Sequence, residues 1–321
     1  MQRDSERNQA KMISWIIPCF NEDCVIEETI KRIKDATSSI SLNYKFEYIF
    51  IDDGSTDKTR QVLKEIASKD KNIKIVALSR NFGHQVSLQA GLNYCNGSAA
   101  LIIDADLQDP PEIANEMLEL WEDGFDVIYG RRLNRAAESI LKRFTAKIYY
   151  RVLNYISDIN IPINTGDFRL IDKKVILALK QMPERGRYMR GLISWCGFKQ
   201  TYISYNREAR FAGRTKYSLD KMVNFALDGI TSFSRKPLRM ATYSGVFASG
   251  LSLIGIIYVL AIRLLTNTWV AGWATLAIAI LLTSSIQLIF LGILGEYIGR
   301  SYIESKSRPL YFVDELIGFE N

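Results

Sequence analysis

The stretch from Ala99 to Glu112 constrains the fold most strongly, because an apolar run in it stops abruptly at a cluster of acids. The run is short and wholly apolar, which is typical of a central strand buried on both faces of a parallel sheet. Open α/β sheets bind ligands at the carboxyl ends of their strands. Asp104 and Asp106 follow the run, so the stretch predicts a buried strand that delivers two carboxylates to a ligand-binding edge.

Two carboxylates at such an edge suit a divalent metal that holds a diphosphate. Mg²⁺ and Mn²⁺ prefer oxygen ligands, and one or two carboxylates commonly hold Mg²⁺ while substrate phosphates and water fill its other positions. An Asp-x-Asp triplet alone is equally compatible with a solvated acidic turn. We interpret Asp104 and Asp106 as ligands and Asp109 as structural, since Pro110 and Glu112 fit a helix start that Asp109 caps.

Apolar runs and helix-like segments alternate through the first part of the chain. Further strands are predicted by the apolar runs at 13–18, 48–51, 73–78 and 127–130. Helices are predicted at 25–38, at 56–68 and from a start near His84. Strands that alternate with helices predict βαβ units, right-handed crossovers and a mostly parallel sheet. The acid-bearing ends of three of these strands then face one edge.

Four blocks of residues follow these strands: Ile-Ile-Pro-Cys-Phe-Asn-Glu at 16–22, Asp-Asp-Gly-Ser at 52–55, Arg-Asn-Phe-Gly at 80–83 and Asp-Ala-Asp-Leu-Gln-Asp-Pro-Pro at 104–111. As a set, the blocks resemble the signature of family 2 glycosyltransferases of the GT-A fold. Their order and spacing are similar to the branch that loads sugars onto polyprenyl phosphates, which includes dolichyl-phosphate mannose synthases and bactoprenol glucosyltransferases. The resemblance covers residues 13 to about 235, and its later part extends through the membrane segments.

The resemblance implies roles for individual residues. It places the donor against Pro18, Phe20, Glu22, Asp53, Asp104, Asp106 and Gln108, with Mg²⁺ or Mn²⁺ held by Asp104, Asp106 and Gln108. A carboxylate such as that of Asp53 accepts a hydrogen bond from uracil N–H or a ribose hydroxyl, and Gly54 lets the backbone approach the ligand. The block 52–55 also fits a turn in which Ser55 caps the next helix and Asp52 is structural.

A later block, Asn-Thr-Gly-Asp-Phe-Arg at 164–169, contains Asp167 at the position that matches the family's candidate catalytic base. A phosphate acceptor is already an anion at neutral pH and has little need of a base. Two interpretations stay open: Asp167 accepts a proton, or it orients the acceptor and balances nearby cations. Asp106 is the second residue that we expect to act in catalysis, through the metal.

An anionic acceptor requires positive charge. Basic residues gather after the strand 127–130, along a helical segment with an apolar face at 140–156, and in 207–217, which resembles the family's acceptor loop. Most of these cations are expected to be solvated or to touch lipid headgroups. Arginine binds phosphate through two parallel hydrogen bonds, whereas lysine offers a point charge. We expect acceptor-phosphate contacts from Arg131, Arg143, Arg210 and Lys216.

Two long uncharged stretches lie near the C-terminus, at 240–262 and 264–295. Each can form a helix of about 20 residues, enough to cross roughly 30 Å of hydrocarbon. We expect two spans rather than a re-entrant hairpin, because Trp269 and Trp273 suit a membrane interface. Basic residues before the first span and after the second place the catalytic domain and both termini in the cytoplasm, at the inner membrane. An apolar stripe at 219–233 predicts an interfacial helix.

The predicted architecture is an α/β, Rossmann-like GT-A catalytic domain at 12–215. Around it we expect a polar tail at 1–11, an amphipathic juxtamembrane region at 216–239, two transmembrane helices within 240–295 and a cytoplasmic tail at 296–321. The net charge of +6 suits an anionic leaflet and anionic substrates. No nucleic-acid-binding module is recognisable. The four cysteines lack metal-ligand spacing, and a single histidine, His84, argues against a histidine-based site.

The expected reaction is an inverting, metal-dependent transfer of a hexose from a nucleotide sugar to a polyprenyl phosphate. The acceptor phosphate attacks the anomeric carbon as the diphosphate leaves, and catalysis rests on positioning and charge stabilisation. UDP-glucose is the first expected donor, with GDP-mannose or an aminoarabinose-type donor as alternatives. A non-catalytic membrane scaffold is the competing class of function. Small residues around Gly245 and Gly250 permit close packing in a homo-oligomer.

Overall fold

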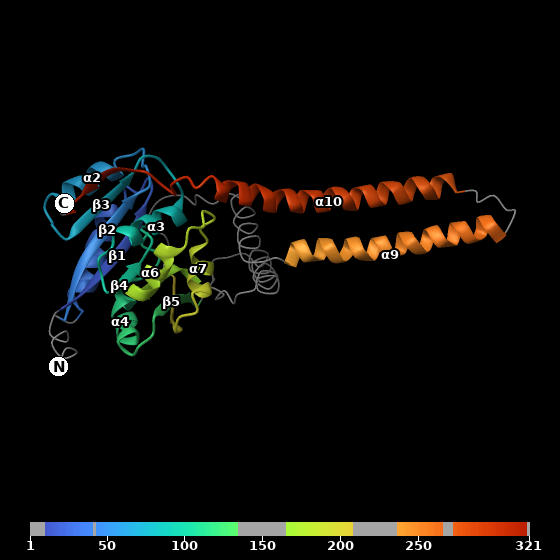
Figure 1. The fold of residues 1–321 in the computed structure, drawn as a ribbon. Helices are drawn as coiled ribbons and strands as arrows, with labels where there is room; N and C mark the ends of the chain where they lie inside the picture. The colour runs from blue at the N-terminus through green and yellow to red at the C-terminus, as the bar shows by residue number, and fades with distance from the viewer. Residues whose placement is uncertain (1–9, 41–42, 134–164, 208–235, 266–271, 320–321) are drawn as a thin grey trace.

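The computed structural model describes residues 10–40, 43–133, 165–207, 236–265 and 272–319. These residues form a layered α/β body and two long helices that run side by side away from it (Figure 1). The body is built on an eight-stranded sheet with the strand order β7-β5-β6-β4-β1-β2-β3-β8.

The first half of the chain forms the parallel part of the sheet. Its strands are β1 (Lys11–Cys19), β2 (Tyr44–Asp52), β3 (Ile73–Leu78) and β4 (Ala99–Ile102). The helices between them are α1 (Ile26–Ser38), α2 (Thr59–Ala67) and α3 (His84–Tyr94). Neighbouring strands here are parallel, which confirms the βαβ prediction. The apolar runs at 13–18, 48–51 and 73–78 all lie in strands, as predicted.

The second half of the sheet is mixed. After β4 come a short 3-10 helix η2 (Pro111–Ile113), α4 (Ala114–Glu122) and β5 (Val127–Arg132). The later elements are β6 (Thr165–Asp172), α6 (Lys173–Gln181), α7 (Met189–Trp195) and β7 (Gln200–Tyr205). Strand β6 lies between β4 and β5 and is antiparallel to both. Among the described strands, four neighbouring pairs are parallel and three antiparallel, so the sheet is mostly parallel as expected.

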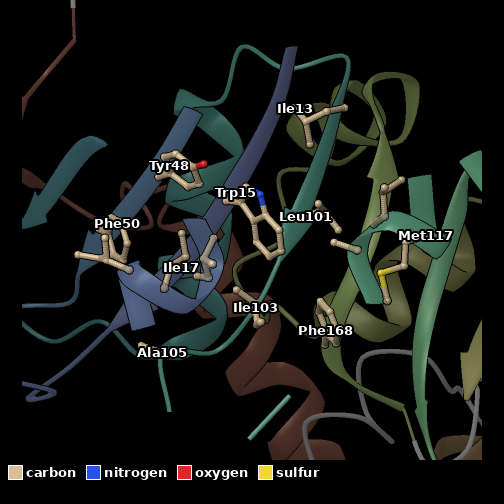
Figure 2. Packing of buried hydrophobic residues seen from close by; sticks show 14 of the residues in the cluster. Ile13, Trp15, Ile17, Tyr48, Phe50, Leu101, Ile103, Ala105, Met117 and Phe168 are labelled. Carbon is tan, nitrogen blue, oxygen red and sulfur yellow. The ribbon is translucent and has the colours of Figure 1, made fainter. Parts of the chain in front are cut away.

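Both faces of the sheet are covered, which explains why its central strands are continuous apolar runs rather than alternating ones. On one face Trp15, Ile17 and Phe50 pack with residues of α1, α2 and α4 (Figure 2). On the other face Ile16 and Ile51 pack with residues of α3, α6 and α7. The strands are therefore held rigidly, and the loops at their carboxyl ends are well placed to carry a site.

Two helices form the hairpin, α9 (Lys236–Leu265) and α10 (Trp273–Ser305). Their apolar side chains are largely exposed, Phe247 and Leu288 among them. Within the described residues, the segment Ile278–Ser305 of α10 is long and apolar enough to cross a membrane by length and composition. No second helix of this kind is found among the described residues, so the span expected in α9 remains a prediction. The expected helices at 140–156 and 219–233 lie outside the described residues.

The C-terminal residues differ from the tail that we expected at 296–321. Helix α10 continues to Ser305, and β8 (Val313–Ile317) then adds an antiparallel edge strand to β3. Figure 1 shows α10 running back towards the α/β body and the chain after it continuing to the sheet. The boundary predicted at residue 215 therefore leaves out one strand of the catalytic sheet. A strand of five residues carries too little pattern to be distinguished from a tail by sequence alone.

Candidate active site

The carboxyl ends of β1, β2 and β3 are joined by hydrogen bonds between their loops. The Asp53 N–H donates to the Cys19 carbonyl at 2.9 Å, and the Asn21 N–H donates to Ser55 Oγ at 3.0 Å. Glu22 N–H donates to Thr59 Oγ1 at 2.8 Å. Phe20 and Glu22 are half-buried at this edge, next to Pro18 near the end of β1. The loops thus form one continuous rim, in which the donor contacts predicted for these residues remain predictions.

Asp52 is structural, as one of our interpretations held. Its buried carboxylate accepts a hydrogen bond from the Ser55 N–H at 2.9 Å and forms an ion pair with Arg60 Nε at 2.6 Å. The accompanying idea that Ser55 caps the next helix is wrong, because α2 begins only at Thr59 and its N-cap residue makes no side-chain cap. Asp57 accepts from the Thr59 N–H instead.

Asp53 joins the loop after β2 to the loop after β3. Its two carboxylate oxygens accept hydrogen bonds from the Phe82 N–H at 2.7 Å and the Gly83 N–H at 2.9 Å. Burial raises the pKa of this carboxyl, and the two backbone hydrogen bonds oppose that rise. A Cβ on Gly54, at a φ of 68°, would lie 2.4 Å from the Arg80 carbonyl carbon. The close approach that requires glycine is therefore to a neighbouring loop, where we expected a ligand.

The antiparallel pairing of β4 with β6 brings two predicted site residues together. Ile102 is paired with Arg169 in an antiparallel register. Asp104, two residues after Ile102, is therefore level with Asp167, two residues before Arg169. His84 at the start of α3 lies between these two acids. Its Nε2 is 3.5 Å from Asp104 Oδ1 and 3.2 Å from Asp167 Oδ2. Burial opposes a charge on this imidazole, but Asp104 and Asp167 raise the His84 pKa to about 9.

Asp167 is surrounded by hydrogen-bond donors. Arg190 Nε lies 2.9 Å from its Oδ1, Arg169 Nη2 lies 3.3 Å from the same oxygen, and Gln85 Nε2 lies 3.4 Å from Oδ2. Burial by itself would raise the pKa of Asp167, but the Arg190 guanidinium and His84 hold it well below its usual value. Asp167 is therefore a carboxylate that stays ionised and holds its neighbours in place.

The acidic turn after β4 fits a divalent cation. Burial, together with the negative charge of nearby carboxylates, raises the pKa of Asp104 to about 6 although His84 opposes the rise. Within the described part of the chain, Asp104 Oδ1 is buried and lacks a hydrogen-bond partner. Asp106 Oδ1 accepts a hydrogen bond from the Gln108 N–H at 3.2 Å across Leu107, whose φ is 56°. A positive φ at leucine is strained, and such strain is concentrated at functional sites.

The number of protein side chains that could bind a metal ion at this turn is small. Among the residues described, no three His, Cys, Asp or Glu side chains are grouped to hold a metal ion. The arrangement instead suits a cation held by one or two carboxylates, with oxygens of a bound diphosphate completing its coordination. Thr29 on α1 fixes the turn by donating to the Ala105 carbonyl at 2.8 Å.

Our prediction that Asp109 caps a helix is wrong. The N-cap of η2 is Pro110, without a side-chain hydrogen bond, and Glu112 pairs with Arg32 at 2.7 Å. The buried Asp109 carboxylate instead accepts from the Tyr205 hydroxyl at 2.5 Å and from Arg132 at 3.3 Å. Asp109 is thus structural, but it ties the acidic turn to β5 and β7 rather than to the following helix.

The predicted acceptor cations are only partly within the described residues. Arg131, exposed at the end of β5, has its guanidinium 4.8 Å from the ring centre of Tyr202. Arg143, Arg210 and Lys216 lie outside the described residues. Their phosphate contacts therefore remain predictions, and so does that of Arg131.

Sequence reasoning missed three partners of Asp167: Arg169, Gln85 and Arg190. Arg169 could have been found, because residues two apart on a strand share a face and Arg169 stands two after Asp167. Arg190 carries no such local signal, since it follows Asp167 by 23 residues on another element. The sequence predicts a helix that starts near His84, and α3 does begin there, while His84 also bridges two acids.

Comparison with known proteins adds two matches to family models. Residues 14–179 match the model of glycosyl transferase family 2, and residues 236–301 match that of the GtrB C-terminal hairpin. The chain is 46% identical over 308 residues to the uncharacterized glycosyltransferase YkcC of Bacillus subtilis, covering 96% of this chain and 95% of that protein.

It is 39% identical over 301 residues to the bactoprenol glucosyl transferase of Shigella phage SfV, covering 94% of this chain and 97% of that protein. Among solved structures, glucosyl-3-phosphoglycerate synthase of Mycobacterium tuberculosis is 18% identical, with a TM-score of 0.46 over 69% of this chain and 78% of that one.

Proposed function

Because the chain belongs to glycosyl transferase family 2, we propose that it transfers glucose from UDP-glucose to a polyprenyl phosphate with inversion at the anomeric carbon. One observation carries this proposal. The likeness to a protein named bactoprenol glucosyl transferase extends over 94% of the chain, through both the catalytic domain and the hairpin. Bactoprenol phosphate is a polyprenyl phosphate, and the hairpin is the part of the chain suited to such a lipid.

The donor would bind at the rim formed by the loops after β1 to β4. Asp104, Asp106 and Gln108 would hold Mg²⁺ or Mn²⁺ against the donor diphosphate. Asp104 Oδ1, which lacks a hydrogen bond among the described residues and lies 3.5 Å from His84 Nε2, would supply one oxygen. The cation would offset the negative charge that develops on the leaving diphosphate. Pro18, Phe20, Glu22 and the loop held by Asp53 would enclose the nucleotide.

Asp167 would position the acceptor rather than remove a proton from it. Its oxygens already accept hydrogen bonds from Arg190, Arg169 and Gln85, and its low pKa makes it a weak proton acceptor. The acceptor phosphate is ionised without help. Asp167 would instead keep Arg190 and His84 oriented beside the acidic turn, while Arg131, Arg143, Arg210 and Lys216 would supply charge for the acceptor phosphate.

The hairpin would hold the enzyme in the cytoplasmic membrane. We propose that α9 and α10 both cross the bilayer, with the catalytic domain and both termini in the cytoplasm. The exposed apolar surface of both helices supports this topology. A lipid acceptor in the same bilayer would then meet a cytosolic nucleotide sugar at the domain surface, and small residues on α9 would permit a homo-oligomer.

A donor panel tests the proposal. Membranes that contain the full-length protein are incubated with undecaprenyl phosphate, Mg²⁺ and one radiolabelled donor at a time, and organic-soluble label is measured. We expect label from UDP-glucose and little from GDP-mannose or an aminoarabinose donor. Label from one of the other donors alone would correct the sugar. Absence of product with every donor, alongside intact protein, would support the scaffold alternative.

A further inference from the structure

The C-terminal segment 311–317 packs along the β3 edge of the sheet. It follows α10 and forms β8 along the edge of β3, with Ile75 paired to Ile317 and Leu78 paired to Val313. The Ser79 N–H donates to the Phe312 carbonyl at 3.0 Å. The pairing thus continues to the point where β3 ends and the loop 79–83 begins.

Arg60 on α2 connects this segment to the loop after β2. Its Nε lies 2.6 Å from Asp52 Oδ2, its Nη1 lies 2.7 Å from Asp314 Oδ2, and its Nη2 donates to the Leu78 carbonyl at 3.0 Å. Asp52 is fully buried, and its other oxygen holds the Ser55 N–H. One guanidinium therefore links β8, the end of β3 and the turn that contains Asp53.

Phe312 makes a second connection, to the loop after β3. Its ring centre lies 6.5 Å from that of Phe82, and the planes are tilted by 51°. The Arg80 guanidinium also lies over the Phe82 ring, 4.1 Å from its centre. The backbone N–H of Phe82 is one of the two donors that Asp53 accepts. The two connections therefore converge on the same pair of loops from different directions.

We propose that the C-terminal segment is a positioning element of the nucleotide site. Phe312 and Asp314 hold the loops 52–55 and 79–83 in the geometry that binds a nucleoside diphosphate, so residues that follow the membrane hairpin set donor affinity. This inference rests on the proposed function, since it assumes that these loops bind the donor nucleotide. The segment touches neither Asp104 nor Asp167 in the described contacts, so its effect should fall on the donor and spare the acceptor.

The test compares the full-length protein with a variant carrying Phe312→Ala and Asp314→Asn. UDP binding is measured by calorimetry with Mg²⁺, and hydrogen exchange of residues 79–83 is measured without nucleotide. Loss of an aromatic pair and of an exposed ion pair predicts a Kd for UDP that rises roughly three- to tenfold. Exchange at the amides of Phe82 and Gly83 should accelerate by a similar factor. The donor KM should rise with it, whereas the acceptor KM should stay unchanged.

Two controls separate positioning from general stability. Glu315→Gln removes an ion pair with Lys64 from the same strand, and Phe312→Tyr keeps the ring; both should bind UDP and exchange normally. Unchanged exchange and Kd in the double variant would overturn the proposal, as would an equal loss in Glu315→Gln. If the wild-type protein binds GDP instead of UDP, the proposed donor is wrong, and the same comparison with GDP still decides the role of the segment.

Discussion

Replacement of Arg190 by glutamine should impair transfer because it removes the charged partner closest to Asp167. The two hydrogen bonds, at 2.9 and 3.3 Å, join the Asp167 side chain, which is 7% exposed, to the Arg190 side chain, which is 19% exposed. Breaking a buried ion pair costs about 3–5 kcal/mol. Arg169 and His84 remain beside Asp167, so we expect a smaller loss of about 1.5–3 kcal/mol, the range for a hydrogen bond to a charged group.

If this loss falls on the transition state, kcat/KM for the polyprenyl phosphate decreases by roughly ten- to a hundredfold. The assay is initial-rate transfer at varied acceptor concentration with saturating UDP-glucose. Arg185→Gln is the matched control, since the described hydrogen bonds of Arg185 are made by its backbone, from its N–H to Glu304 and from the Arg187 N–H to its carbonyl. Wild-type kcat/KM in Arg190→Gln would refute the claim that Arg190 and Asp167 act together.

Three other predictions follow from the site and the hairpin. Asp106→Asn should lower turnover by roughly a hundredfold or more, because it removes charge from the ligand set; near-normal transfer in excess chelator would contradict a metal role. A cysteine placed at Thr268 should react with an impermeant reagent from outside the cell, whereas its protection would favour a re-entrant hairpin. Because the folded pKa of His84 is raised to about 9, its contribution to stability is complete below about pH 6.5 and is lost as the pH rises towards 9. Thermal unfolding of the metal-free protein should therefore show a decline over that range that His84→Gln removes, and an identical decline in the variant would assign it to other groups.

The sequence predicts most of the nucleotide-binding half of the fold. The run at 73–78 coincides with β3, and the helix expected at 25–38 begins one residue later, at Ile26. These elements can be predicted from the sequence because each is long, has apolar residues at a regular spacing and is bounded by polar residues. Parallel strands also share an edge, so the meeting of the 16–22, 52–55 and 80–83 blocks could be inferred without coordinates.

The parts that escaped prediction depend on pairing between distant elements. Asp109 has a local pattern that fits a helix cap, yet Tyr205 and Arg132 from two other strands take its carboxylate. The sequence predicts that Gly54 lets the backbone approach a ligand, but only the folded arrangement reveals the Arg80 backbone beside it. The segment at 313–317 is short, and its role as an edge strand depends on β3, which is more than 230 residues earlier in the chain.

The most direct test of the central claim is the structure of the lipid-linked product. Purified full-length protein is given UDP-glucose, Mg²⁺ and undecaprenyl phosphate, and the anomeric configuration of the isolated glycolipid is determined by NMR. Since UDP-glucose is an α-linked donor, direct attack by the acceptor phosphate predicts β-glucosyl phosphate, formed by the wild type and formed roughly a hundredfold or more slowly by Asp106→Asn. An α-linked product, or equal product formation by Asp106→Asn, would contradict the account.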